Sequence, residues 1–170
     1  MKKFYITTPL YYVNDEPHIG HAYTTILADV LNRFNNFTGE DSFMLTGSDE
    51  HGQKVQEAAE KRNVSPIDHV NEYVLNFTDL WNRLNISYDD FIRTTDKRHK
   101  DRVKDMLNDL WNRDEIYLDE YEGSYSISEE RFITDKEIED GQFKQIIKLK
   151  EKNYFFKMSK YQNQLINHIN

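Results

Sequence analysis

The sequence contains no cysteine. Disulfide bonds and thiolate-ligated metal sites are therefore excluded. No apolar run approaches the length needed to span a membrane, and the first residues, MKKFYITT, lack the apolar core of a signal peptide. Basic residues are outnumbered, with 22 Lys and Arg against 30 Asp and Glu and a formal net charge of -8, which argues against a dedicated nucleic-acid-binding module. We expect a soluble cytoplasmic protein with no membrane partner.

The 170 residues are enough for one domain, or for one domain with a small insert, and for a buried core. Lys3 to Thr8 is rich in aromatic and β-branched residues, which predicts a first strand that stops at Pro9. The chain then turns through Asn14 and Asp15, and Pro17 suits the first position of a helix. The apolar residues of this helix recur at helical spacing and predict one buried face: Ile26, Leu27, Val30, Leu31 and Phe34. The helix is predicted to end near 38–39, where glycine is a common stop.

His18, Gly20 and His21 fall in the first turn of this predicted helix. A first helical turn presents unpaired N–H groups and a partial positive charge, so it favours phosphate oxygens. Two imidazoles three residues apart can also donate hydrogen bonds to a triphosphate as charge builds in a transition state. Glycine inside a helix costs roughly 0.5–1 kcal/mol relative to alanine, so Gly20 suggests that a flat or bulky group approaches the backbone.

A second parallel strand is predicted from Ser42 to Thr46, with Gly47 to Glu50 at its carboxyl end, where open α/β sheets bind ligands. There Asp49 can accept a charge-assisted hydrogen bond from a cationic group of a ligand. The alternative is that Ser48 or Asp49 caps a helix beginning near His51, and the two roles are compatible.

The rest of the chain divides into helices followed by shorter strands. Ser65 and Pro66 open a helix with an apolar stripe that we interpret as core: Val70, Tyr73, Val74, Phe77, Leu80, Trp81 and Leu84. A short strand at 91–93 precedes a helix that begins after Thr95 or Asp96 and runs to about Arg113, with these residues facing inward: Val103, Met106, Leu107, Leu110 and Trp111. From Tyr117 on, strand-like segments flank a short helix at 135–139 with Thr134 and Glu137 at capping-box spacing.

Four segments carry a family resemblance: 8–14 (TPLYYVN), 17–25 (PHIGHAYTT), 45–52 (LTGSDEHG) and 89–95 (DDFIRTT). Together they closely resemble the methionyl-tRNA synthetases, and HIGH at 18–21 is the signature of class I aminoacyl-tRNA synthetases. The resemblance covers nearly the whole chain and weakens after about Tyr125. It implies an α/β fold that is the first half of a Rossmann-like nucleotide-binding domain, plus a small α+β connective insert. It also implies an ATP-dependent ligase that joins L-methionine to tRNA(Met), with Mg²⁺ accompanying the ATP.

The resemblance also assigns roles to individual positions. His18 and His21 would hold the phosphates and be the catalytic residues, and Gly20 would admit the adenine ring. The other implied contacts are Pro9 and Asn14 to ATP, Leu10, Tyr12 and Asp49 to methionine, and supporting roles for Gly47, His51 and Gly52. The domains implied are a catalytic half-fold at 1–115, a connective insert at 116–157 and a helix leading back to the catalytic fold at 158–170.

Many members of the family hold zinc through cysteines in the insert, but here Ser126 and Glu129 stand where the first pair would be. We therefore expect no zinc, and an insert packed by its aromatic residues: Tyr125, Phe132, Tyr154, Phe155 and Phe156. Lys157 to Lys160 (KMSK) resembles the second class I signature, KMSKS. We interpret it as a chance match, with Ser159 as a helix N-cap, because Tyr161 replaces the last serine and the family's signature lies much later.

Several alternatives stay open on the sequence. His18, His21 and His51 form a possible metal site, although no zinc-ligand spacing follows them. His69, His99 and His168 are interpreted as surface residues. The rival functions are another class I synthetase, a nucleotidyltransferase with a histidine-rich first helix, and a non-catalytic binding module.

Overall fold

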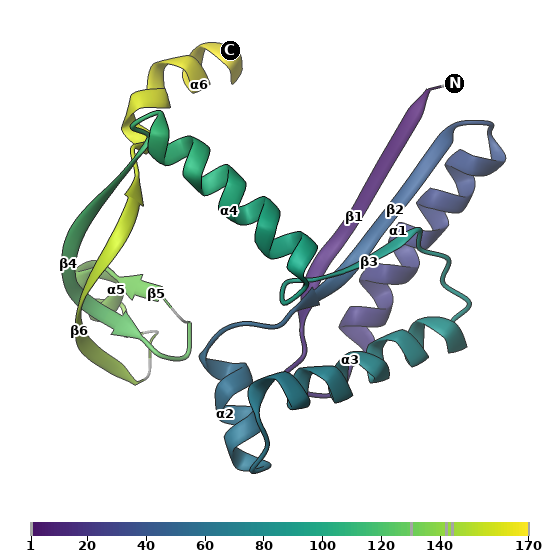
Figure 1. Ribbon diagram of the computed structural model, residues 1–170, viewed down its shortest axis with the longest axis horizontal. Coiled ribbons are helices and arrows are strands. Elements are labelled where there is room, and N and C mark those ends of the chain that lie inside the picture. Colours follow the sequence, from purple (N-terminus) through teal and green to yellow (C-terminus); the bar gives the residue numbers. More distant parts are fainter. Residues whose placement is uncertain (1, 130, 142, 144, 170) are drawn as a thin grey trace. The chain divides into compact units, whose positions relative to one another are not determined.

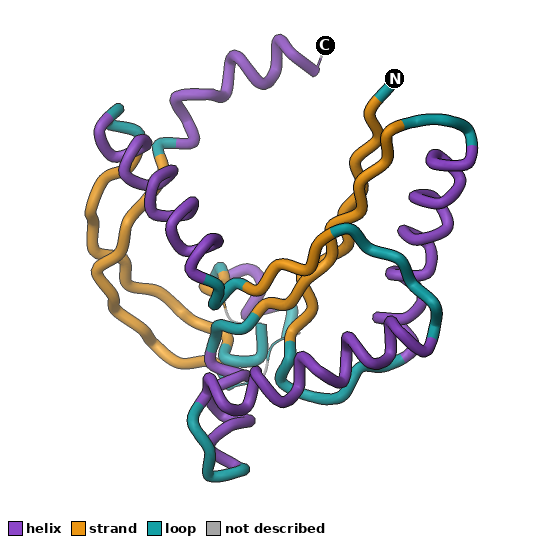
Figure 2. Tube along the Cα trace, turned by 45° about the vertical axis from the view of Figure 1, so that its right-hand side comes forward, coloured by secondary structure: helices purple, strands orange, loops and turns teal. Residues whose placement is uncertain are grey.

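The computed structural model describes residues 2–129, 131–141, 143 and 145–169. The chain forms two compact units, and the boundary between them in the sequence lies between Arg102 and Val103. The first unit is a parallel sheet of order β1-β2-β3 with three helices (Figures 1 and 2). Its elements are β1 (Lys3–Tyr12), α1 (Ile19–Phe37), β2 (Asp41–Asp49), α2 (Gln53–Lys61), α3 (Pro66–Arg83) and β3 (Asp90–Arg93). Helix α4 (Lys97–Asn112) runs from this unit into the second.

The second unit contains an antiparallel sheet of order β5-β4-β6. Its elements are β4 (Ile116–Ser126), β5 (Arg131–Ile133), α5 (Asp135–Glu139), β6 (Ile146–Phe156), the short 3₁₀ helix η1 (Met158–Tyr161) and α6 (Gln162–Ile169). A parallel sheet with helices followed by a small antiparallel sheet confirms the predicted fold class. Within the described residues, no helix combines the length and apolar character that a membrane crossing requires.

Strand β1 does not stop at Pro9, as the sequence predicted, but continues to Tyr12. Thr7 pairs with Leu45 and Leu10 pairs with Gly47, so β1 holds one residue more than β2 across this interval. The extra residue makes a bulge, where a proline without an N–H group is tolerated because the ladder is already interrupted. The Thr8 hydroxyl supports the bulge by donating to the Pro9 carbonyl oxygen (2.8 Å), and it lies 2.8 Å from the Thr46 hydroxyl. The bulge thus extends β1 toward the predicted site.

Gly47 allows β2 and β3 to approach each other closely. A Cβ atom at this position would lie 2.0 Å from the Ile92 carbonyl oxygen and 2.7 Å from its Cγ2 atom. The carbonyl oxygen belongs to the backbone of the paired strand β3, so it cannot move aside without disturbing the pairing. Glycine at position 47 is therefore required for the packing of the central strand.

We expect Gly47→Ala to lower the free energy of unfolding of the 170-residue chain by about 1–3 kcal/mol, the usual cost of overpacking a core. Urea unfolding followed by circular dichroism would measure this loss. Gly39→Asn is the control, because Gly39 has a φ of +88° with open space around it and asparagine tolerates that conformation. An unchanged unfolding midpoint for Gly47→Ala would refute the packing argument.

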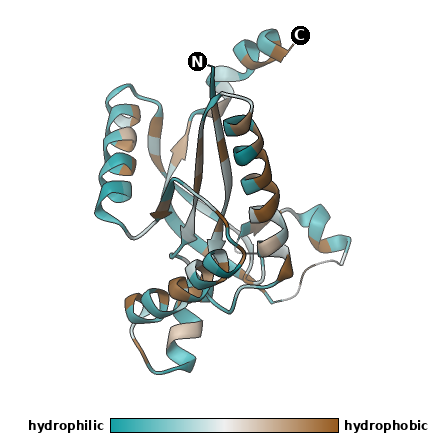
Figure 3. Ribbon diagram, turned by 90° about the vertical axis from the view of Figure 1, so that its right-hand side faces the viewer, coloured by the Kyte–Doolittle hydropathy of each residue, from teal (hydrophilic) through white to brown (hydrophobic). Residues whose placement is uncertain are grey.

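Helix α1 packs on the sheet through a different face from the one predicted. Hydrophobic and hydrophilic residues both occur along this helix (Figure 3). Its buried residues are Thr25, Ala28, Asp29 and Asn32, whereas the apolar residues predicted to be buried are 40–61% exposed: Ile26, Leu27, Val30, Leu31 and Phe34. The inner face can be largely polar because each of its polar side chains has a hydrogen-bond partner. Thr25 Oγ1 lies 2.8 Å from the Tyr11 hydroxyl, and Asp29 Oδ1 accepts the Ser87 amide at 2.8 Å. Hydrogen bonds therefore orient this helix against its intrinsic apolar stripe.

The core of the first unit gathers side chains from β1, β2, α2 and α3, with Trp81, Phe77, Met44 and Val13 all less than 2% exposed. The predicted N-cap at Ser65 is confirmed, since its side chain accepts the Asp68 amide at 3.2 Å. The apolar stripe of α3 is largely confirmed, although Leu84 is 38% exposed. Polar side chains are also buried in this unit. His69, which the sequence placed at the surface, is 1% exposed.

In the second unit the predicted capping box of α5 is confirmed, since Thr134 and Glu137 satisfy each other's backbone amides. A hydrogen bond from Arg131, with two more from Thr134, lowers the pKa of the Glu137 carboxyl to about 2.

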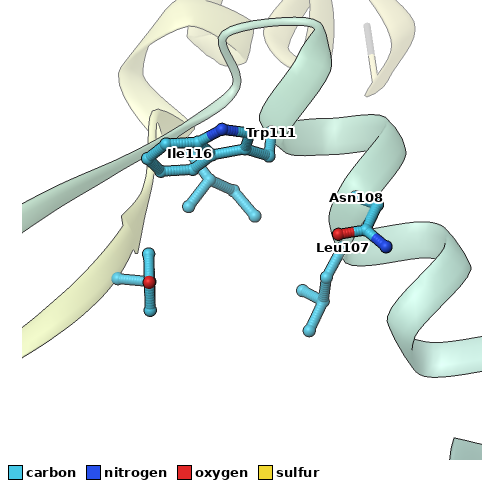
Figure 4. Close-up of a pocket in the computed structure, with 5 residues that line it drawn as sticks. Leu107, Asn108, Trp111 and Ile116 are labelled. Carbon is cyan, nitrogen blue, oxygen red and sulfur yellow. The ribbon is translucent and has the colours of Figure 1, made fainter.

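The prediction for α4 was wrong, because none of its residues is buried and Val103, Met106, Leu107 and Trp111 are 40–66% exposed. Leu107, Asn108 and Trp111 instead line an open hollow of about 330 Å³ with Ile116 and Tyr154 (Figure 4).

The KMSK segment lies against two acidic residues at the start of the second sheet. Lys160 Nζ donates to the buried Glu115 carboxylate at 2.8 Å, and Lys157 Nζ lies 2.7 Å from Asp114 Oδ1. The Lys160 ammonium lowers the pKa of Glu115. Ser159 is not an N-cap, because it lies inside η1, whose cap position is Lys157. Both lysines thus have structural partners, which supports the interpretation of this segment as a chance match.

Candidate functional site

His18 and His21 form a stacked pair at the start of α1. Their ring centroids are 3.8 Å apart and the ring planes differ by 21°. The helix begins at Ile19, so Pro17 does not hold the first helical position as predicted but precedes the N-cap, which is His18. His18 Nδ1 accepts the Gly20 amide at 3.0 Å, and His21 Nδ1 accepts the His18 amide at 3.1 Å. The two rings form a capping box that fixes their positions.

These hydrogen bonds also fix which ring nitrogen carries a proton. Because both Nδ1 atoms accept backbone N–H groups, the neutral form of each ring carries its hydrogen on Nε2. Burial against Tyr11 and Phe77, whose ring centroids lie 5.0 and 5.2 Å from that of His21, lowers the pKa of His21, and the neighbouring His18 lowers it further. The lowered pKa favours the neutral ring that the capping box requires. Each histidine therefore has an Nε2–H donor in addition to the Nδ1 atom that makes the cap.

Gly20 makes room for the capping histidine. A Cβ atom here would lie 2.9 Å from His18 Cε1 and 3.1 Å from His18 Nδ1. The group that approaches the backbone at this point is the His18 ring, and the predicted approach of the adenine ring stays a prediction. A side chain at position 20 would therefore require the His18 imidazole to shift.

The residues predicted to contact methionine meet at the carboxyl ends of β1 and β2. Leu10 pairs with Gly47 and Tyr12 pairs with Asp49. Directly paired residues of a parallel sheet share a face, and alternate residues of a strand do too, so these four lie on one face. Tyr11, between them, faces the other side, where it contacts Thr25 of α1. Leu10 and Tyr12 are 37% and 39% exposed, so this face is accessible to a ligand.

Asp49 does not cap the following helix. Helix α2 begins at Gln53 with Gly52 as its N-cap and without a side-chain capping bond, so the capping alternative for Ser48 and Asp49 is wrong. The Thr94 hydroxyl donates a long hydrogen bond to the Asp49 carboxylate, with 3.5 Å between Thr94 Oγ1 and Asp49 Oδ1. Thr94 Oγ1 also accepts the Glu50 amide at 2.8 Å, which ties the end of β2 to the end of β3.

Sequence reasoning missed Glu50 and Arg93, which form a buried ion pair beside Asp49. Arg93 donates to both Glu50 carboxylate oxygens, at 2.6 and 2.9 Å, and the side chain of Glu50 is 0% exposed. Ser48 and Thr95 add their hydroxyls to the same carboxylate. The available signal was the position of the two residues, because both stand at the carboxyl ends of strands that the sequence predicted.

The remaining predicted residues surround this edge of the sheet. Pro9 lies in the bulge of β1, Gly52 has a φ of +106° at the start of α2, and His51 Nε2 lies 3.3 Å from the Thr94 carbonyl oxygen. Asn14 lines a hollow of about 360 Å³ that is bounded by α2 and α3. In the ranges that the structure describes, no three His, Asp or Glu side chains are grouped as metal ligands, so nothing there supports the alternative metal site.

Comparisons with known proteins agree with this geometry. The methionine–tRNA ligase of Campylobacter jejuni subsp. jejuni is 50% identical over 167 residues, which cover 95% of this chain and 27% of that protein. The methionine–tRNA ligase of Fusobacterium nucleatum subsp. nucleatum is 46% identical, with 99% of this chain and 27% of that protein covered. A solved structure of Mycobacterium tuberculosis methionyl-tRNA synthetase in complex with methionyl-adenylate matches with a TM-score of 0.91 at 36% identity, covering 99% of this chain and 35% of that one.

The chain thus spans about a quarter of the length of the curated relatives it matches. The family model described as tRNA synthetases class I (M) matches residues 4–142, which is most of the chain. This match and the identity to the curated relatives lead to one conclusion: the chain belongs to the methionine group of class I tRNA synthetases.

Proposed function

We propose that this chain is the N-terminal part of the catalytic domain of a methionyl-tRNA synthetase, which activates L-methionine with ATP and transfers it to tRNA(Met) in the cytoplasm. The observation that carries the proposal is the pairing of Tyr12 with Asp49 and of Leu10 with Gly47, because it collects the three predicted methionine contacts on one accessible face. The stacked His18 and His21 begin the helix that follows the same strand. The complex of the M. tuberculosis relative with methionyl-adenylate supports this assignment.

In the proposed reaction a methionine carboxylate oxygen attacks the α-phosphorus of ATP. The bond from that phosphorus to the bridging oxygen breaks, and pyrophosphate leaves with the bonding electrons, giving methionyl-adenylate. Positioning and charge stabilisation supply most of the rate in such transfers. His18 and His21 donate Nε2–H groups to the phosphates, while the N–H groups of the first turn of α1 add to the positive field. Asp49 accepts a charge-assisted hydrogen bond from the methionine ammonium group.

The other assignments follow from the same proposal. Residues 1–115 form the first half of the catalytic fold, 116–157 a connective insert without the thiolate zinc site, and 158–170 the return to the catalytic fold. Magnesium enters with ATP as part of the substrate. In the insert, the buried Ser126 hydroxyl lies 3.1 Å from that of Ser128 and 3.4 Å from the Glu129 amide, so hydrogen bonds hold the turn where relatives place cysteines.

The test is methionine-dependent exchange of pyrophosphate into ATP, measured with the full-length protein and with the 170-residue chain. We expect exchange with methionine and not with other amino acids. Asp49→Asn removes the negative charge and preserves the shape, so it should raise the KM for methionine by roughly 10–150-fold, which corresponds to the loss of one charge-assisted hydrogen bond of about 1.5–3 kcal/mol. The KM for ATP should change little, because Asp49 does not contact the phosphates.

The rival functions give different results in the same assay. Exchange with another amino acid would assign the chain to a different class I synthetase, and exchange without any amino acid would make it a nucleotidyltransferase. A full-length protein with no exchange at all would favour a non-catalytic binding module. An unchanged KM for methionine in Asp49→Asn would remove Asp49 from the methionine site without affecting the family assignment.

A further inference from the structure

We propose that His69 is a positioning residue that holds the loop between β1 and α1, and with it the ATP side of the active site. The inference rests on the proposed function, because it assigns a role in ATP binding to that loop. His69 lies in the first turns of α3, is 1% exposed, and belongs to neither the HIGH segment nor the strand ends. It is a buried titratable group that the proposed mechanism does not use.

Both ring nitrogens of His69 have partners with only one possible polarity. Nε2 lies 3.0 Å from the Val13 carbonyl oxygen, which can only accept a hydrogen bond. Nδ1 lies 3.1 Å from Arg62 Nη1, which can only donate. His69 is therefore the neutral ring with its hydrogen on Nε2, and it connects the end of α2 to the end of β1.

Other groups hold His69 in this orientation. The Tyr73 ring stacks on it with centroids 4.3 Å apart, and the Arg62 guanidinium lies over Tyr73 at 4.9 Å. Arg62 also donates to Glu72 at 2.6 Å, so its direction is fixed independently of His69. An imidazole fixed on both edges and on one face has little freedom to turn, which is what a residue that positions a backbone group requires.

The anchored atom is well placed to control the loop. Val13 follows directly after the last residue of β1 and is 0% exposed, and only four residues separate it from the His18 N-cap. Asn14, predicted to contact ATP, is the next residue. Asn76 of α3 makes a second, exposed tether by donating to Glu16 at 3.0 Å. Helix α3 thus holds both ends of the segment that leads from the methionine contacts to the phosphate contacts.

The test compares His69→Leu with His69→Gln in the full-length protein. Leucine fills similar space without hydrogen bonds, whereas glutamine can donate to Val13 and accept from Arg62. We expect His69→Leu to raise the KM for ATP in pyrophosphate exchange by roughly tenfold, equivalent to the loss of about 1.4 kcal/mol, with the KM for methionine within twofold of the wild type. His69→Gln should restore most of the ATP affinity.

A second measurement does not depend on activity. Amide hydrogen exchange at residues 14–16 should become faster in His69→Leu and return toward the wild-type rate in His69→Gln, while the amides of α3 stay protected. Unchanged exchange of the loop amides would overturn the proposal, and so would an equal rise of both KM values or a failure of glutamine to restore the loop. Wild-type protein that shows no methionine-dependent exchange would instead refute the proposed function, and the hydrogen-exchange comparison would still decide whether His69 holds the loop.

Discussion

Replacing His18 by alanine should slow methionine-dependent pyrophosphate exchange by the full-length protein roughly 10–1000-fold, and replacing His21 should have an effect in the same range. Removal of one preorganised donor to a transition-state oxygen costs about 100–1000-fold, the upper part of this range. The structure supports a loss of this size because the capping box engages both Nδ1 atoms and leaves each Nε2–H group as the donor. The donors are fixed before substrate arrives, so no reorganisation is needed during the reaction.

A matched variant separates catalysis from helix capping. His18 is the N-cap of α1, so His18→Ala also removes a cap worth about 0.5–2 kcal/mol of stability. Serine is an excellent N-cap residue but is too short to reach the phosphates, so His18→Ser should keep the stability and still lose the exchange activity. If His18→Ser exchanged pyrophosphate at the wild-type rate, the histidine would have only a structural role and the assignment would be wrong.

The sequence predicted the order of the helices and strands better than it predicted how they pack. Helix α1 begins and ends, and strand β2 begins, close to the expected residues, because Asn14, Pro17 and Gly39 are local signals that act through backbone conformation. The pairing of β1 with β2 follows from their connection through a helix, because two parallel strands joined in this way are usually neighbours in one sheet with a right-handed crossover. These features depend on residues that are close in the chain, which is why pattern reasoning found them.

The errors arose where distant residues decide the structure. The residues around Pro9 do not show that β1 has one extra residue opposite β2. This bulge is what lets the strand continue past the proline. The buried polar face of α1 depends on Tyr11 and Ser87, and the burial of His69 depends on Val13 and Arg62. A polar side chain can be buried when it has a hydrogen-bond partner, and a partner on another element leaves no periodic signal in the sequence.

Replacing Arg93 by alanine should lower the free energy of unfolding by about 3–5 kcal/mol. The Glu50 side chain would then stay fully buried but lose both hydrogen bonds from the Arg93 guanidinium, and a buried charge without its partner is costly. Urea unfolding of the 170-residue chain would measure the loss. Lys97→Ala is the matched control, because Lys97 pairs with Asp101 at an exposed i,i+4 position and should cost less than about 1 kcal/mol.

A double variant tests whether the burial of charge is the cause. Glu50→Leu combined with Arg93→Leu removes both charges, so it should be less destabilising than Arg93→Ala alone, although Ser48 and Thr95 lose their shared acceptor. A double variant as unstable as the sum of the single variants would show that the pair contributes no coupling. Thr94 connects Glu50 to Asp49 in the same hydrogen-bond network. Arg93→Ala should therefore also raise the KM for methionine in the full-length protein that remains folded. Such a rise would show that substrate binding depends on the stability of this edge of the sheet.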